Sequence, residues 1–277
     1  MSALHKTAWL LLGGAALALM PAELTASAQP SASAPDFQSG QAAWLHPPGG
    51  EFPAVQGSPV PMRQDPAHPF VGNNTGRQPT YRMGDVSNPN LKQWVKDTMK
   101  KDNEEVLKGK IAFSARSSCL PGGTPVFTLF GGQPIFFIQS ADKVLMVYEG
   151  DHQVRHVYLN VPHSKAVKPS WYGESVGHYE GDTLVVDTIG QNTKTVVDSY
   201  RTPHSEKLHV EERYRLMDGG KKLRVDIKIE DPDTFNQPWS SYQEYQRGQQ
   251  TLEEEACAEN NQHLFDYHIP EAKKADF

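Results

Sequence analysis

The part of the chain after Ile111 is a succession of short β-like segments, and this pattern restricts the fold more than any other feature. Each segment is rich in Val, Ile, Tyr and Phe and ends at turn residues. In KKLRVDIKIEDP, at 221–232, aliphatic and charged side chains alternate, which indicates one buried face and one solvated face. Almost no helical sequence separates the segments. We therefore expect a mainly β fold, an antiparallel meander that closes as a lipocalin- or calycin-like barrel or folds as a sandwich.

One helix is expected ahead of these strands. Residues 88–110, NPNLKQWVKDTMKKDNEEVLKGK, have apolar side chains at helical spacing between Pro89 near the start and Gly109 at the end. The preceding residues 29–88 are rich in Pro, Gly, Ser, Asn and Gln and show no sustained period, so we interpret them as an extended leader, disordered at its start, with packing over the domain near Trp44 and Phe70 as a further expectation. The expected domain, a helix plus an antiparallel barrel, covers residues 89–277.

Residues 1–28 have the features of a secretory signal peptide. Lys6 precedes an apolar run at 8–20, and an A-x-A site follows at 26–28. The run is shorter than the roughly 20 apolar residues of a membrane span. We therefore predict a mature protein that begins near Gln29, is periplasmic or secreted, and does not insert into the membrane after cleavage.

The charge balance argues against several classes of partner. The net charge is −6, and it stays −6 without residues 1–28 because one basic and one acidic residue leave together. The chain has no basic stretch, which disfavours nucleic acid and anionic lipid as partners. We expect a small-molecule substrate or ligand, and the oligomeric state is left open by the sequence.

The chain has two cysteines, Cys119 and Cys257. In an oxidising compartment, an isolated pair far apart in the sequence is most simply a disulfide. Closing so long a loop would stabilise the fold by roughly 4–5 kcal/mol in the chain-entropy model. Two buried free thiols or a nucleophilic cysteine are the alternatives.

One carboxylate interrupts an apolar row. In KLHVEERYRL, at 207–216, Glu212 shares a face with Val210 and Tyr214. A buried carboxylate is costly unless it is paired or protonated. Glu212 is therefore either the partner of an inward arginine, such as Arg155 or Arg116, or a general acid or base with a histidine beside it.

The central third of the chain holds most of the candidate site residues. Six histidines lie there: His152, His156, His163, His178, His204 and His209. The catalytic candidates beside Glu212 are three of them, His178, His204 and His209, together with Asp187. No H-x-H, H-E-x-x-H or C-x-x-C spacing occurs, and no glycine-rich turn joins a strand to a helix. We expect neither a metal nor a cofactor, with a His–carboxylate metal site assembled across strands as the alternative.

Candidate ligand contacts lie in the same region. GESVG, at 173–177, has the lettering of a G-x-S-x-G elbow but lacks the strand before it and the helix after it, so Ser175 is only an available hydroxyl. The aromatic side chains either fill the core or line a pocket for a flat or sugar-like ligand. The expected substrate-binding set is Trp171, Tyr172, Ser175, Tyr179, Arg155 and Tyr214.

Five blocks carry a resemblance to a known group of proteins: GDHQVRHVYLNVPHS, PSWYGESVGHYEGDTLVVDTIG, PHSEKLHVEERYR, VDIKIEDP and CAENN. Over roughly Lys110 to Asn261 the chain resembles a large family of secreted bacterial proteins, most of them uncharacterised. The resemblance implies export and a β-rich domain. It implies no particular activity.

Two function classes follow. The first is an exported, cofactor-independent acid–base enzyme, a lyase, isomerase or hydrolase, that acts on a small organic molecule in a barrel cavity. The second is a non-catalytic periplasmic binding or carrier protein for a hydrophobic or aromatic ligand. A catalyst needs ionisable groups that converge on the cavity, and a carrier needs mainly apolar lining. The polar central third favours the enzyme.

Overall fold

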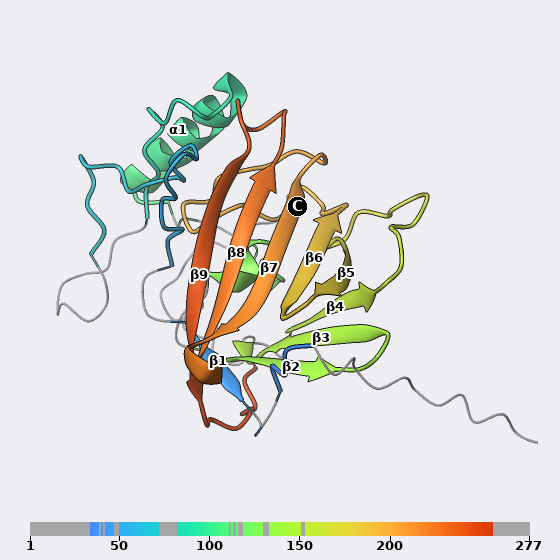
Figure 1. The fold of residues 1–277 in the computed structure, drawn as a ribbon. Coiled ribbons are helices and arrows are strands. Elements are labelled where there is room, and N and C mark those ends of the chain that lie inside the picture. The colour runs from blue at the N-terminus through green and yellow to red at the C-terminus, as the bar shows by residue number, and fades with distance from the viewer. Residues whose placement is uncertain are drawn as a thin grey trace, which may run out of the picture.

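The computed structural model is a closed nine-stranded β-barrel (Figure 1). It describes residues 34–38, 40, 42–46, 50–71, 82–110, 112, 115, 119–129, 133–150 and 153–256. The strands are β1 (Ala43–Leu45), β2 (Ile135–Gln139), β3 (Lys143–Tyr148), β4 (Gln153–Leu159), β5 (Glu174–Glu180), β6 (Thr183–Ile189), β7 (His209–Met217), β8 (Lys222–Glu230) and β9 (Trp239–Gly248). The helices are α1 (Gln93–Leu107) and the 3-10 turns η3 (Val126–Thr128) and η5 (Asp218–Gly220). The mainly β prediction is confirmed, and closure as a barrel replaces the sandwich alternative.

An odd number of strands has a topological consequence for the barrel. Strands whose directions simply alternate cannot close a ring of nine, so at least one neighbouring pair must be parallel. That pair is β4–β5, whereas β1 pairs with β9 antiparallel and closes the ring. A parallel pair cannot be joined by a hairpin and needs a crossover connection. Residues 160–173, the crossover segment, supply it, and the expected meander is interrupted at this point.

The first strand of the barrel comes from the segment expected to be a leader. Trp44, at the centre of β1, is fully buried and pairs with Arg247 on β9 and Ile135 on β2. Phe52 and Met62 of the same segment are also buried. The expected boundary between residues 88 and 89 is therefore wrong, because apolar side chains within a Pro- and Gly-rich sequence join the core and complete the ring. The predicted signal peptide at 1–28 lies outside the described residues.

The predicted helix is confirmed as α1, which lies at the end of the barrel where β8 leads to β9 (Figure 1). Val95 and Met99, one turn apart, are its buried side chains. Trp94 is 42% exposed, and its ring nitrogen donates to the backbone oxygen of Asp233 at 2.6 Å. Among the described helices, none combines the length and apolar composition needed to cross a bilayer.

The interior of the barrel is packed. Inward side chains of β2 to β9 form one apolar core, and η3 contributes Phe127 to it. In Figure 1, η3 is seen behind β7 and β8. The ring of Phe127 lies 5.9 Å from that of Tyr148 on β3, and the Tyr245 hydroxyl on β9 donates to the carbonyl of Thr128 at 2.6 Å. The chain thus fills space inside the barrel with its own residues.

Candidate functional site

Glu212 lies inside the barrel, as its place in the apolar row predicts. The alternation of β7 buries Val210, Glu212 and Tyr214 together, and Glu212 is 0% exposed. Its carboxylate pairs with Arg155 of β4, with 2.5 Å between Oε2 and Nη2, and Arg155 is also 0% exposed. The Tyr214 hydroxyl donates to the second carboxylate oxygen at 2.8 Å. Both oxygens of Glu212 are therefore satisfied by buried protein groups.

Arg155 lies on β4 and is held by side chains of the next three strands. Its guanidinium donates to Thr188 on β6 at 2.8 Å, to Ser175 on β5 at 3.2 Å and to Tyr214 on β7 at 3.4 Å, in addition to Glu212. Burial lowers the pKa of Arg155, but the negative charge of Glu212 more than offsets this and holds the pKa above its ordinary value. Burial, followed by the nearby Glu212 charge, raises the pKa of Tyr214 well above its usual range. We call Arg155, Ser175, Thr188, Glu212 and Tyr214 the inner network.

The structure does not place a histidine beside Glu212, because the candidate histidines bond elsewhere. His178 lies on the outer face of β5 and bonds to Glu180 at 3.0 Å. His204 is buried in the segment of chain that connects β6 to β7. Its two ring nitrogens contact the Thr195 hydroxyl and the carbonyl of Ser205. Burial lowers the pKa of His204. Within the described residues, the expected catalytic couple around Glu212 is thus replaced by the arginine pair.

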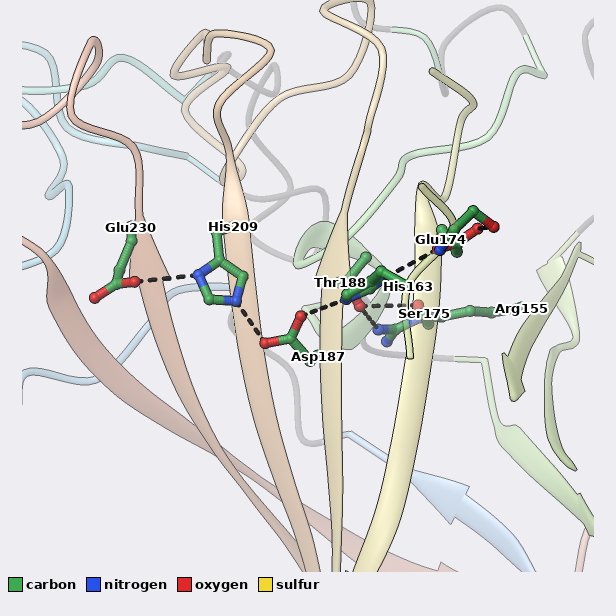
Figure 2. A network of polar contacts seen from close by, with 9 residues as sticks. Arg155, His163, Glu174, Ser175, Asp187, Thr188, His209 and Glu230 are labelled. Atoms are coloured by element: carbon green, nitrogen blue, oxygen red, sulfur yellow. Dashed lines mark hydrogen bonds and ion pairs between the residues drawn. The ribbon is translucent and has the colours of Figure 1, made fainter. Parts of the chain in front are cut away.

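A second polar network lies on the outer face of the barrel. Figure 2 shows it running from Glu230 through His209 and Asp187 to His163 and Glu174. His209 contacts Asp187 at 2.6 Å and Glu230 at 3.1 Å. His163 contacts the other oxygen of Asp187 at 2.6 Å and Glu174 at 3.0 Å. This outer network joins the crossover segment to β5, β6, β7 and β8.

Both histidines of the outer network have carboxylates at both ring nitrogens. The hydrogen bond to Asp187 raises the pKa of His209, against the effect of burial. Burial raises the pKa of Asp187, but hydrogen bonds from His209 and His163 outweigh it and bring the pKa below its ordinary value. Neither ring has a nitrogen left over for a substrate. The sequence singled out Asp187 and His209 for catalysis, and the structure brings these two together in a network of ion pairs.

An open pocket of about 600 Å³ lies between the outer face of β4 and the crossover segment. On the β4 side it is lined by Val154, His156 and Tyr158, which alternate outward along the strand. The rings of His156 and Tyr158 are stacked, with centroids 6.3 Å apart. Trp171 and Tyr172 close the other side. We call this the crossover pocket.

The crossover segment is fixed at both ends of the pocket. Near its start, the backbone nitrogen and hydroxyl of Ser164 donate to Glu174 at 2.7 and 2.5 Å, next to the His163 contact. Further on, Ser170 bonds through its backbone to Gly190, where any side chain would collide with Val167. Gly173 has a φ of 67°, and a β-carbon there would lie 2.4 Å from a backbone oxygen, so only glycine fits the return into β5.

The residues predicted to bind substrate lie in three places: the crossover pocket, the edge of the core and the inner network. Trp171, Tyr172 and Ser175 line the crossover pocket. Tyr179 packs against the core, and its hydroxyl receives a hydrogen bond from Gln139 at 2.9 Å. Arg155 and Tyr214 belong to the inner network.

Several pocket and network residues were not singled out as site residues, among them His156, Tyr158 and His163. Strand alternation in β4 could have placed the first two on one face. No local pattern indicates His163, because its partners come from other strands.

Two expectations concern covalent and metal chemistry. Cys119 is not a free cysteine, but its predicted partner Cys257 lies outside the described residues, so the pairing stays a prediction. In the part of the chain that the structure describes, no group of three or more His, Cys, Asp or Glu side chains is arranged to hold a metal ion.

Comparison with known proteins gives no further guide: no family model, curated protein or solved structure matches the chain. The resemblance to secreted bacterial proteins therefore stays a prediction. Inferences about function rest on the geometry of the pocket and of the two networks.

The inner network predicts a large loss of stability when one partner is removed. Glu212→Gln leaves the Arg155 charge buried without a counter-charge, so we expect a loss of roughly 3–5 kcal/mol in the free energy of unfolding. Urea unfolding measures it. Glu211→Gln, the outward neighbour on β7, is the matched control and should change stability by about 0.5 kcal/mol or less.

A double variant distinguishes the effect of an unpaired buried charge from the effect of altered side-chain packing. Glu212→Leu with Arg155→Met removes both charges, so it should be more stable than Glu212→Gln alone. A Glu212→Gln protein that unfolds like the wild type would show that the pair contributes nothing.

The outer network predicts a pH dependence of stability. Because the folded pKa of His209 lies above its unfolded value of about 6.5, its contribution is complete below that pH and is lost as the pH rises through the folded pKa. His209→Gln should therefore reduce the fall in the free energy of unfolding between about pH 6 and pH 8.5 by an amount on the order of 1 kcal/mol or less for a partly exposed pair, and the fall in Tm becomes smaller with it.

The control for this measurement is His178→Gln, because His178 is more exposed and contacts a single carboxylate, Glu180. It should leave the slope of Tm against pH close to that of the wild type. If His209→Gln also has the wild-type slope, protonation of His209 does not contribute to the stability of the fold, and this account of the outer network is wrong.

Proposed function

We propose that the protein is an exported binding or carrier protein that holds a small, flat aromatic ligand in the crossover pocket. The observation that carries this is the lining of the pocket, where Tyr158, Trp171 and Tyr172 bring three aromatic side chains to one opening. Aromatic faces bind planar ligands by offset or edge-to-face contacts. Tyr158 is 46% exposed, so its ring is available for such a contact.

The pocket walls are positioned in advance of a ligand. Tyr172 is anchored by its hydroxyl to Gln153 and by its ring to Phe127, with 5.6 Å between centroids. The crossover segment is fixed by Ser164 and His163 at one point and by Ser170 at another. A site whose walls are already fixed loses less conformational entropy when a ligand binds.

The ligand lies outside the barrel in this proposal. Lipocalin-like barrels, the type expected from the sequence, hold a ligand in the interior. Here η3 and the inner network occupy interior space. The proposal therefore keeps the barrel as a scaffold and places binding on its outer wall, where an irregular connection runs over a regular sheet.

The polar groups of the inner and outer networks favour binding over acid–base catalysis. An acid or base needs a proton or lone pair directed at the substrate. Glu212 is bonded at both oxygens, and His163 and His209 are bonded at both ring nitrogens. These groups would have to leave stabilising contacts before they could act, so we favour the carrier.

Titration with 2-naphthamide, a neutral planar probe, tests the proposal by isothermal calorimetry. From about −0.3 kcal/mol per non-hydrogen atom we expect a Kd of about 1 mM or lower. Trp171→Ala should weaken binding by roughly two- to tenfold, the value of one aromatic contact. Trp94→Ala, which removes an exposed tryptophan from α1, should leave the Kd unchanged.

Two outcomes would overturn the proposal. One is the lack of any binding by the folded wild type. The other is a measurable Kd that neither Trp171→Ala nor Tyr158→Ala alters, which would put the probe at a different place. Melting curves of each variant show that it is folded.

A further inference from the structure

We infer that the aromatic ligand of the crossover pocket carries a negative charge, in the simplest case a carboxylate, that pairs with Lys168. This inference rests on the proposed function and specifies its ligand class as planar aromatic acids. Lys168 lies on the pocket lining and in the exposed middle of the crossover segment. Its ammonium group is a strong partner for a carboxylate at the rim of an apolar surface.

The crossover segment has the opposite charge from the protein as a whole, and the pocket lining itself holds one lysine, Lys168, and one carboxylate, Glu174. The chain has a net charge of −6, yet the crossover segment, NVPHSKAVKPSWYG, has two lysines and no acidic residue. A third lysine, Lys194, places its ammonium group 5.9 Å from the centre of the Trp171 ring. An anion that approaches this acidic protein therefore meets lysine side chains on the crossover segment and beside Trp171.

The carboxylate on the pocket lining, Glu174, is already occupied. Three hydrogen bonds reach it, two from Ser164 and one from His163. Hydrogen bonds from Ser164 first, and then from His163, lower the pKa of Glu174, so it stays ionised and bound to these partners. The Glu174 carboxylate is thus bonded to Ser164 and His163 and does not face the ligand as a free negative charge.

The ammonium group of Lys168 is available to a ligand. Among the residues that the structure describes, no ion pair or hydrogen bond to its side chain is present. Basic side chains elsewhere on the barrel, such as Arg213 and Arg224, are paired with carboxylates on neighbouring strands. A lysine that lines the same pocket as three aromatic rings, and that has no ion-pair partner among the described residues, matches an aromatic acid.

The test compares 2-naphthoate with 2-naphthamide, which have nearly the same shape and differ in charge. At about pH 8, where histidines of ordinary pKa are neutral, the wild type should bind naphthoate roughly three- to fivefold more tightly, the share of an exposed ion pair. Lys168→Met should bring the ratio of the two affinities close to one. Lys165→Met, a lysine of the same segment that does not line the pocket, should keep the wild-type ratio.

The dependence of the two affinities on salt concentration is a second measurement. It would not distinguish the two probes if Lys168 had only a structural role. Raising the ionic strength from about 0.02 M to about 0.5 M should reduce the preference of the wild type for naphthoate and leave naphthamide binding unchanged. A wild type that binds both probes equally, or a Lys168→Met variant that keeps the preference, overturns the anion inference while the proposed function stands. If neither probe binds, both are overturned together.

Discussion

The buried ion pair between Arg155 and Glu212 is the interaction on which the rest of the structure depends. It connects β4 to β7 through the barrel interior, and the same guanidinium reaches Ser175 on β5 and Thr188 on β6. Two charges leave water at high cost, and only complete hydrogen bonding offsets it. The parallel β4–β5 pair has just three residue pairs in register, so the network behind it is what fixes these two strands in position.

The crossover pocket follows from the same part of the barrel. Nine strands require a parallel pair, and a parallel pair requires a connection that returns along the barrel. Residues 160–173 make that return on the outer face, and the outer network attaches them to the wall through His163. The inner network joins the strands inside the barrel, and the outer network attaches the crossover segment to its outer face. The crossover pocket lies between the crossover segment and β4. In the proposed function, ligand binding uses mainly outward side chains of strands whose inward side chains form the core, and Ser175 belongs to both the inner network and the pocket lining.

The alternation of residues along a strand predicted which side chains point into the barrel, but not which residues of other strands they contact. The period of two in β7 placed Glu212 inside, and Arg155 was one of two arginines named as its possible partner. The leader was misread, since three residues around Trp44 give no periodic signal yet complete the ring. Without β1 the barrel would have an even number of strands, and an even number can close with every neighbouring pair antiparallel. The sequence therefore offered no reason to expect the parallel pair. The contacts of Asp187 with two histidines depend on that topology and could not be read locally.

Fluorine NMR of protein labelled with 5-fluorotryptophan tests most directly the claim that ligands bind outside a filled barrel. Trp171 lines the crossover pocket, whereas Trp44 and Trp239 are buried in the core. On addition of 2-naphthoate, the account predicts that the Trp171 resonance shifts with the binding isotherm while those of Trp44 and Trp239 stay in place. Shifts of Trp44 or Trp239 with an unchanged Trp171 resonance would contradict it, because the ligand would then occupy the interior.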